Sequence, residues 1–235
     1  INFDQKKTIE MLETYKALVG MSPEGIHHWQ NGRDFYASDV VPLTFWASYL
    51  LDDIAGTRDN VPIMVDDNPQ SLALAQDTNV IVGMAGPSNP DGGTWVEVHN
   101  FGVTVDANTD EAAAFIEYVM NEEYVTWLGM APEGSFPIRP GPSAGSKIFI
   151  DEWGNLPIGV DRKIPINQIY SGEIIESLIN GLAVGTRWGA KEGQLPVAAK
   201  LVNSGLMNRL MMEYINGDRS AEETVDMLNS EAAKL

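Results

Sequence analysis

The chain has 235 residues, of which 44% are hydrophobic, so it can fill the core of one large domain or two small ones. Its 33 acidic residues outnumber its 15 basic residues and give a formal net charge of -18, which argues against binding to nucleic acid or anionic membranes. The chain has no cysteine, which excludes disulfides, cysteinate zinc sites and thiol nucleophiles. The acids are scattered singly and in pairs such as Asp52-Asp53, so we expect a solvated acidic surface, either of a protein from a salty milieu or of an ordinary acidic secreted protein.

The first part of the chain is expected to contain helices and one strand. Residues 4–19 carry apolar side chains at helical spacing, with Asp4 as the N-cap and Gly20 as the stop. After a Ser-Pro-Glu-Gly turn, three elements are expected: a short helix over 26–38, a mostly apolar strand over 39–46, and a helix over 47–56 that Gly56 closes.

The next part is expected to be richer in strands. Two apolar runs, 61–65 and 79–86, are predicted strands on either side of a short helical stretch over 69–76. A dense turn signal ends at Gly92-Gly93, and the glycines are interpreted as a hairpin that lets a strand over 94–105 begin. A helix over 108–121 follows, and its expected cap and inward-facing residues are Thr109, Ala112, Phe115, Ile116 and Val119.

The last hundred residues are expected to be a loop-rich stretch followed by helices. Residues 132–165 contain one short helical candidate, over 147–153. Helices are then predicted over 164–183, 196–216 and 221–233, the last one capped by Ser220. Strands interspersed with helices predict an α/β fold.

The usual catalytic and metal-binding signals are missing from the sequence. It has three histidines, and the adjacent pair His27-His28 points in different directions on a helix or a strand, which is poor spacing for one metal ion. The HExxH, GxSxG, GxxxxGK[ST] and GxGxxG motifs are absent, so we expect no catalytic residue, no metal site and no cofactor. A glycosidase needs two carboxylates, but among 33 acids such a pair has almost no discriminating power.

Aromatic residues near the ends of predicted elements are more informative. Trp46 follows a predicted strand, Trp95 opens another, Phe136 interrupts a Gly/Pro-rich loop and Trp188 lies in "GTRWGAKEG". Sugars have apolar C–H faces and polar rims, and they stack on flat aromatic rings flanked by hydrogen-bonding groups. Core filling is the commoner role of any one such aromatic, so these residues are candidates only as a set.

The order of segments along the chain resembles a known family. A helix "TIEMLETYKALV", the stretch "DFYASDVVPLTFWA", a strand leading into "NTDEAAAFIEYVMNEE", the loop "GSFPIR" and a C-terminal "INGDRSAEETVDMLNSEAAKL" follow one another. This order is similar to that of the extracellular solute-binding proteins of carbohydrate ABC transporters, the maltose-binding-protein-like family. Ser38-Asp39 stand where that family has a glycine and a basic residue, and Asn203-Ser204-Gly205 stand where it often has an aromatic, which weakens the case for an extended oligosaccharide stack.

The resemblance implies a periplasmic-binding-protein type II fold, in which two α/β lobes close around a ligand like a Venus flytrap. Residues 1–93 and 141–235 would then belong mainly to the second lobe, with a helical C-terminal third, and 94–140 would cross the hinge to the first lobe. The N-terminal lobe would be missing, because family members are longer and the sequence starts without an initiator methionine or a secretion signal.

The function that the resemblance implies is a non-catalytic sugar or oligosaccharide receptor that delivers its ligand to an ABC importer by hinge closure. The implied ligand-binding residues are Trp46, His99, Asn100, Ser135, Phe136, Arg139 and Trp188. The implied partners are the carbohydrate and the membrane subunits of the permease. The protein would be an extracellular or periplasmic monomer, lipid-anchored through the missing N-terminus and with no membrane insertion of this chain. The alternatives are a glycoside-processing hydrolase that uses paired carboxylates, and an acidic interaction module.

Overall fold

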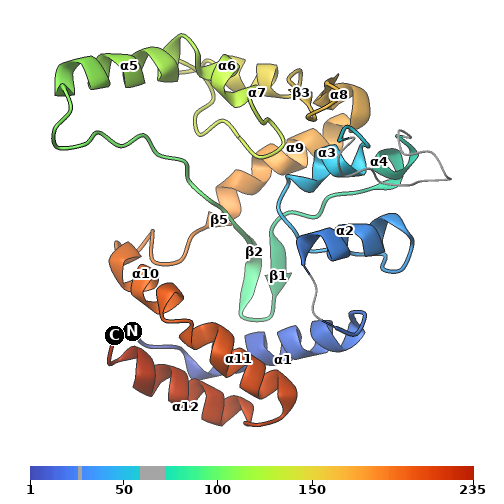
Figure 1. The fold of residues 1–235 in the computed structure, drawn as a ribbon, viewed down its shortest axis with the longest axis vertical. Coiled ribbons are helices and arrows are strands. Elements are labelled where there is room, and N and C mark those ends of the chain that lie inside the picture. Colours follow the sequence, from blue (N-terminus) through green and yellow to red (C-terminus); the bar gives the residue numbers. More distant parts are fainter. Residues whose placement is uncertain (26–27, 59–71) are drawn as a thin grey trace. The chain divides into compact units, whose positions relative to one another are not determined.

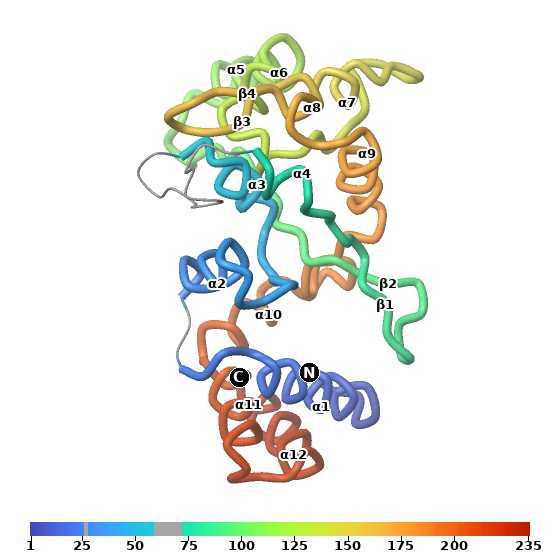
Figure 2. Tube along the Cα trace, turned by 90° about the vertical axis from the view of Figure 1, so that its right-hand side faces the viewer, coloured from blue at the N-terminus to red at the C-terminus, as the bar shows by residue number. Residues whose placement is uncertain are grey.

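The computed structural model describes residues 1–25, 28–58 and 72–235, which fall into two compact units. Unit 1 comprises Ile1–Gly25, Gly83–Glu97 and Ala183–Leu235, and unit 2 comprises Ile26–Val82 and Val98–Leu182 (Figures 1 and 2). These boundaries differ from the divisions near residues 93 and 140 that the resemblance implies. The assignment of segments to the lobes of a receptor, and with it the two-lobed architecture, stays a prediction.

Helices pack side by side in unit 1, where α1, α11 and α12 lie against one another (Figure 1). Their bounds are α1 Gln5–Met21, α10 Leu195–Asn203, α11 Leu206–Asn216 and α12 Ala221–Ala232. The buried side chains between them include Leu12, Leu210, Val225 and Leu228. The N-terminal segment joins this group because the side-chain amide of Asn229 both accepts from the Phe3 N–H and donates to the Phe3 carbonyl.

The caps predicted for two of these helices are confirmed. The Asp4 carboxylate accepts from the Lys7 N–H at 2.8 Å, and the Ser220 hydroxyl accepts from the Glu223 N–H at 3.1 Å. Two boundaries were wrong: α1 continues through Gly20 to Met21, and the helix predicted over 196–216 breaks into α10 and α11. Gly205 has a φ of +65°, a left-handed conformation that interrupts a helix and that glycine adopts without strain.

A small sheet completes unit 1, with strand order β1-β2-β5. Strand β1, Met84–Gly86, pairs antiparallel with β2, Asn89–Trp95, and β2 pairs parallel with β5, Gly185–Thr186. The interpretation of Gly92-Gly93 as the hairpin turn was wrong, because the turn lies at Pro87-Ser88 and both glycines lie inside β2. Gly92 has a φ of +76°, and a Cβ there would lie 2.2 Å from the Gly83 carbonyl oxygen, so this position in the strand requires glycine. The strands predicted over 79–86 and 94–105 were too long, since only 84–86 and 94–95 of them are paired.

Unit 2 is mainly helical. Its helices are α2 Trp29–Ala37, α3 Leu50–Ile54, α4 Ala73–Asp77, α5 Thr109–Asn121, α6 Tyr124–Leu128, α7 Ile148–Trp153, α8 Ile166–Ile169 and α9 Gly172–Gly181, and α9 leads into a 3₁₀ turn, η1 Leu182–Val184. Strands β3, Pro157–Ile158, and β4, Ile164–Pro165, form an antiparallel pair. The core centres on Trp153, whose indole N–H donates to the carbonyls of Pro132 and Ser135, and includes the fully buried Ile158 and Ile166.

Several expectations for unit 2 were wrong. Residues 39–46 form a loop, because no strand of the described chain lies beside them and Pro42 lacks the N–H that a ladder requires. Helix α5 forms as predicted, but its N-cap is Asn108 rather than Thr109. None of its residues is buried, and Phe115 is 60% exposed. Helical spacing gives α5 its conformation, whereas burial of its apolar side needs a packing surface that the described part of unit 2 does not supply.

Other expectations have mixed outcomes. The helix predicted over 147–153 is confirmed as α7, while the one predicted over 164–183 begins as strand β4 and is divided at Tyr170-Ser171. The strand predicted over 61–65 lies outside the described residues, as do residues 69–71 of the helical stretch predicted over 69–76. The rest of that stretch is confirmed as a helix by α4, Ala73–Asp77. Over the ranges that the structure describes, no helix has both the length and the apolarity to cross a bilayer.

Candidate functional site

A pocket of about 170 Å³ in unit 2 contains the first of the predicted ligand-binding residues, Trp46. The pocket combines aromatic rings with one carboxylate and one guanidinium. Its lining residues are Trp29, Trp46, Tyr49, Leu50, Asp53 and Arg58. Trp46 is 58% exposed, so its side chain is not buried in the core. This pocket is therefore the candidate site.

Three neighbouring elements supply the lining. Helix α2 begins with Trp29, and the preceding turn is fixed because the His28 N–H donates to the Asn31 side chain at 3.0 Å. The loop after α2 carries Trp46 and Tyr49. Helix α3 then contributes Asp53, and the chain passes through a turn that hydrogen-bonds the Thr57 N–H and hydroxyl to the Asp52 carbonyl.

Tyr49 is positioned by the backbone of a loop that is distant in sequence. A Cβ on Gly134 would lie 1.9 Å from Cε1 of Tyr49, so the phenol ring rests directly on the glycine. The Pro132–Ser135 loop is itself held to the core by the indole N–H of Trp153. One wall of the pocket is thus set by the requirement that residue 134 has no side chain.

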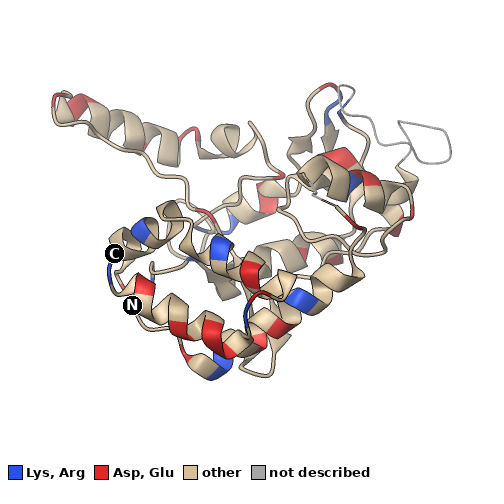
Figure 3. Cartoon of the chain, turned by 60° about the horizontal axis from the view of Figure 1, so that its bottom comes forward, with Lys and Arg blue, Asp and Glu red and all other residues tan. Residues whose placement is uncertain are grey.

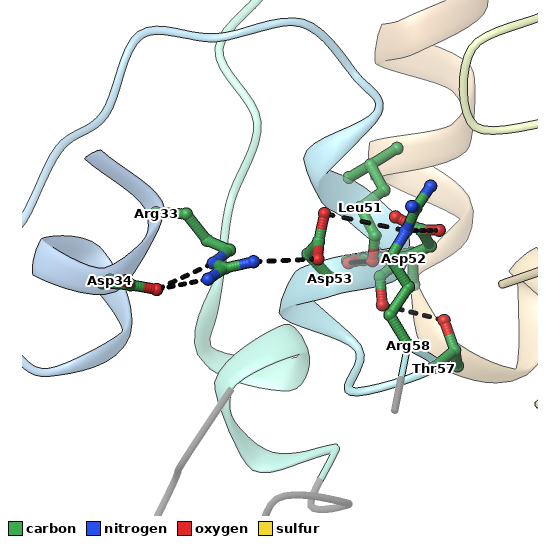
Figure 4. Close-up of polar contacts among 8 residues, drawn as sticks. Arg33, Asp34, Leu51, Asp52, Asp53, Thr57 and Arg58 are labelled. Carbon is green, nitrogen blue, oxygen red and sulfur yellow. Dashed lines mark hydrogen bonds and ion pairs between the residues drawn. The ribbon is translucent and has the colours of Figure 1, made fainter. Parts of the chain in front are cut away.

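Two arginines and three aspartates form a chain of ion pairs that includes the lining residues Asp53 and Arg58 (Figure 4). Arg33 lies within 3.4 Å of Asp53 and 2.6 Å of Asp34, and Nε of Arg58 donates to Asp52 at 2.7 Å and lies 3.9 Å from Asp53. Asp52 and Asp53 are buried, at 0% and 3% exposure, so the expectation of a solvated acidic pair was wrong here. The two arginines compensate these charges, and burial without them would be prohibitively unfavourable.

Three buried carboxyl groups near the pocket have perturbed acidity. Burial raises the pKa of Asp52, and the hydrogen bond from Arg58 offsets part of this rise. Burial together with the charge of Asp52 raises the pKa of Asp53, and burial also raises the pKa of Glu133. Oδ1 of Asp52 and Oε2 of Glu133 have no hydrogen-bond partner among the described residues. The buried cluster therefore holds more carboxylate than its cations fully satisfy.

The arrangement suits binding better than catalysis. Among the lining residues Asp53 is the one carboxylate, and both of its oxygens face guanidinium groups. Hydrolysis of a glycoside requires two carboxyl groups on either side of the bond to be cleaved. In the part of the chain that the structure describes, no group of three or more His, Asp or Glu side chains could hold a metal ion.

Four of the other predicted residues lie in unit 2 outside this pocket. His99 and Asn100 are exposed, and the Asn100 amide donates to the nearby Val98 carbonyl at 3.2 Å. Ser135 and Phe136 serve the core: the Ser135 carbonyl accepts from Trp153, and the Phe136 ring lies 4.8 Å from the Trp153 ring, centroid to centroid. Ligand contact by these residues stays a prediction.

The remaining two predicted residues also lie away from the pocket. Arg139 donates to the Asn121 side chain at 3.0 Å, and its guanidinium lies 5.5 Å and 5.2 Å from the ring centroids of Tyr124 and Phe149. Trp188 belongs to unit 1, where its ring lies 6.1 Å from that of Phe3. Their predicted contact with ligand is likewise untested.

The sequence reasoning missed Trp29, Tyr49 and Arg58. One signal was available for Trp29, because Arg33 follows it at a spacing of four residues on the same helix face. The structure places the Arg33 guanidinium 5.5 Å from the Trp29 ring centroid. No comparable pattern marks Arg58 or Tyr49, and the Tyr49 ring is positioned by Gly134, which is distant in sequence.

No protein-family description, no curated protein sequence and no solved structure matches the chain. The family resemblance carried by the order of segments therefore remains an expectation from sequence.

Proposed function

We propose that the unit 2 pocket binds a single sugar ring without chemical change and that the chain acts as a carbohydrate receptor. The observation that carries this proposal is the grouping of Trp46, Trp29 and Tyr49 around the Asp53–Arg58 ion pair. The rings offer apolar faces to the C–H groups of a sugar, and the ion pair offers an acceptor and several donors to its hydroxyl groups. Such a mixture of flat apolar surface and a few oriented polar groups is typical of small-molecule sites.

The size of the pocket favours one ring over an oligosaccharide. Its volume is about 170 Å³. Pockets for drug-sized ligands occupy roughly 300–1,000 Å³, so this one suits a smaller molecule. The small polar surface of Asn203-Ser204-Gly205, where the resembling family often has an aromatic, is in keeping with a short ligand.

The non-catalytic part of the proposal rests on the charge pattern. A general acid must present a protonated carboxyl to the leaving group, with a second carboxyl across the sugar. Asp53 faces two guanidinium groups, and Asp52, at 0% exposure, does not reach the pocket surface. Binding with release of the unchanged ligand is therefore the simplest use of the site.

The wider role is proposed from the sequence resemblance alone. It includes delivery of the sugar to an ABC permease, closure of two lobes about a hinge, and a location outside the cytoplasmic membrane. A hydrolase and an acidic interaction module are the competing functions.

Calorimetric titration with a panel of monosaccharides tests the proposal. We expect Trp46→Ala to weaken binding at least about tenfold, which corresponds to about 1.4 kcal/mol. The matched control is Trp95→Ala, which removes an indole of similar exposure, 60% against 58%, from unit 1 and should leave the affinity unchanged. Turnover of an aryl glycoside would instead support the hydrolase, and salt-sensitive capture of a basic protein without sugar binding would support the interaction module.

A further inference from the structure

The hydrogen-bonding groups around the pocket are mainly donors. The guanidinium of Arg58, the indole N–H groups of Trp29 and Trp46 and the hydroxyl of Tyr49 can all donate to a ligand. None of these pocket groups, apart from Nε of Arg58, makes a hydrogen bond to a residue that the structure describes. Among the described residues, these donors therefore outnumber the partners that they bind.

Acceptors are fewer among the lining side chains, where Asp53 supplies the one carboxylate. Oδ1 of Asp53 accepts from Nη1 of Arg33 at 3.4 Å, and Oδ2 lies 3.9 Å from Nε of Arg58. Arg58 uses Nε for Asp52, and its Nη1 and Nη2 atoms make no hydrogen bond to the described part of the chain. The Arg58 side chain is 26% exposed and lines the pocket.

We infer that the ligand carries a carboxylate, and that the pocket takes a single-ring sugar acid of the hexuronate class. The carboxylate pairs with Nη1 and Nη2 of Arg58, while the ring lies on Trp46. Two parallel N–H groups of a guanidinium match the two oxygens of a carboxylate, which gives this pairing both strength and orientation. The inference rests on the proposed function and specifies which sugars the same site prefers.

The net charge of the chain does not decide whether the pocket prefers a charged or a neutral ligand. The acidic residues that make up the net charge are spread over many helices (Figure 3). At physiological salt their effect falls off within about 8 Å, so close contacts decide the preference of the pocket. A cationic ligand is disfavoured, because Arg33 already lies 5.5 Å from the Trp29 ring centroid and Arg58 lines the pocket.

The test compares glucuronate and galacturonate with glucose and galactose by calorimetric titration. We expect the wild-type chain to bind at least one uronate about tenfold or more tightly than the matching neutral sugar, because a guanidinium can pair with a carboxylate through two charged hydrogen bonds. Arg58→Lys keeps a cation beside Asp52 but removes the planar fork, so it should abolish this preference for the uronate over the neutral sugar. The control is Arg209→Lys, an arginine of unit 1 that pairs with Glu213 and Glu231 on the surface.

A change in the ligand tests the same contact without altering the protein. The methyl ester of the uronate is uncharged, and we expect the wild-type chain to bind it no more tightly than the neutral sugar. Equal or tighter binding of neutral sugars by the wild-type chain overturns the inference and leaves the proposed function standing. Binding of neither uronate nor neutral sugar overturns both.

Discussion

Glu133 offers a sharp test of how the buried charge cluster affects stability. The residue is 3% exposed, and its Oε2 atom has no hydrogen-bond partner among the described residues. A buried polar group without a partner costs about 1–3 kcal/mol, and a charged one costs more than a neutral one. Glu133→Gln keeps the shape of the side chain and removes the charge, so we expect it to stabilise the protein by about 1–3 kcal/mol above neutral pH.

The pH dependence of this effect follows from the raised pKa of Glu133, for which burial is the main cause. Below the unfolded pKa of about 4.3 the carboxyl is protonated in both states and contributes no penalty. As the pH rises from there through the folded pKa, the unfolded state loses its proton first and wild-type stability falls. The stability difference between Glu133→Gln and wild type should therefore be near zero at about pH 4 and reach its full value above the folded pKa.

Urea unfolding at several pH values, followed by tryptophan fluorescence, measures this difference. The control is Glu10→Gln in unit 1, where hydrogen bonds from the Ser88 side chain and backbone lower the pKa of Glu10, so that this substitution should destabilise at neutral pH. A Glu133→Gln variant that is less stable than wild type at neutral pH, or a difference that does not change with pH, would refute the reasoning.

Two further substitutions test local features of the structure. Gly134→Ala places a Cβ where the Tyr49 ring now lies, and the ring can move away because Tyr49 is 39% exposed. We expect the affinity for sugar to fall several-fold, by about 1 kcal/mol, and the urea midpoint of unfolding to change little. The same loss of affinity in a Tyr49→Ala background would contradict this mechanism. Ser220→Ala removes the α12 cap and should lower the free energy of unfolding by about 1 kcal/mol in urea titration, whereas Ser230→Ala, in the last turn of the same helix, should change it little.

Features with a local cause were predictable from the sequence. Helices α1 and α12 begin at Asp4 and Ser220 because each side chain accepts a backbone N–H three residues on, a contact that depends on nothing distant. The helix breaks at Gly205 for an equally local reason, its left-handed φ, which the apolar pattern around that glycine does not reveal. Strands were harder to predict from the sequence, because an apolar run such as 39–46 becomes a strand only if another strand lies beside it.

The candidate site also combines residues that the sequence pointed out with residues whose role depends on distant contacts. Trp46 stood out because a tryptophan in a predicted junction between elements is free to meet a ligand. Asp52 and Asp53 looked like surface acids, since charged residues rarely lie inside a protein. Their burial depends on Arg33, which reaches Asp53 from another helix, and on Arg58, which pairs with Asp52. No spacing rule predicts the first of these contacts.

Nuclear magnetic resonance of the indole N–H groups tests the central claim most directly. The chain has six tryptophans, and each gives one indole signal that can be assigned by substitution. On titration with the sugar that calorimetry finds to bind most tightly, we predict that the signals of Trp29 and Trp46 shift with the calorimetric affinity, while those of Trp95 and Trp188 in unit 1 stay in place. Sugar binding that leaves Trp29 and Trp46 unmoved would contradict the assignment of this pocket as the ligand site.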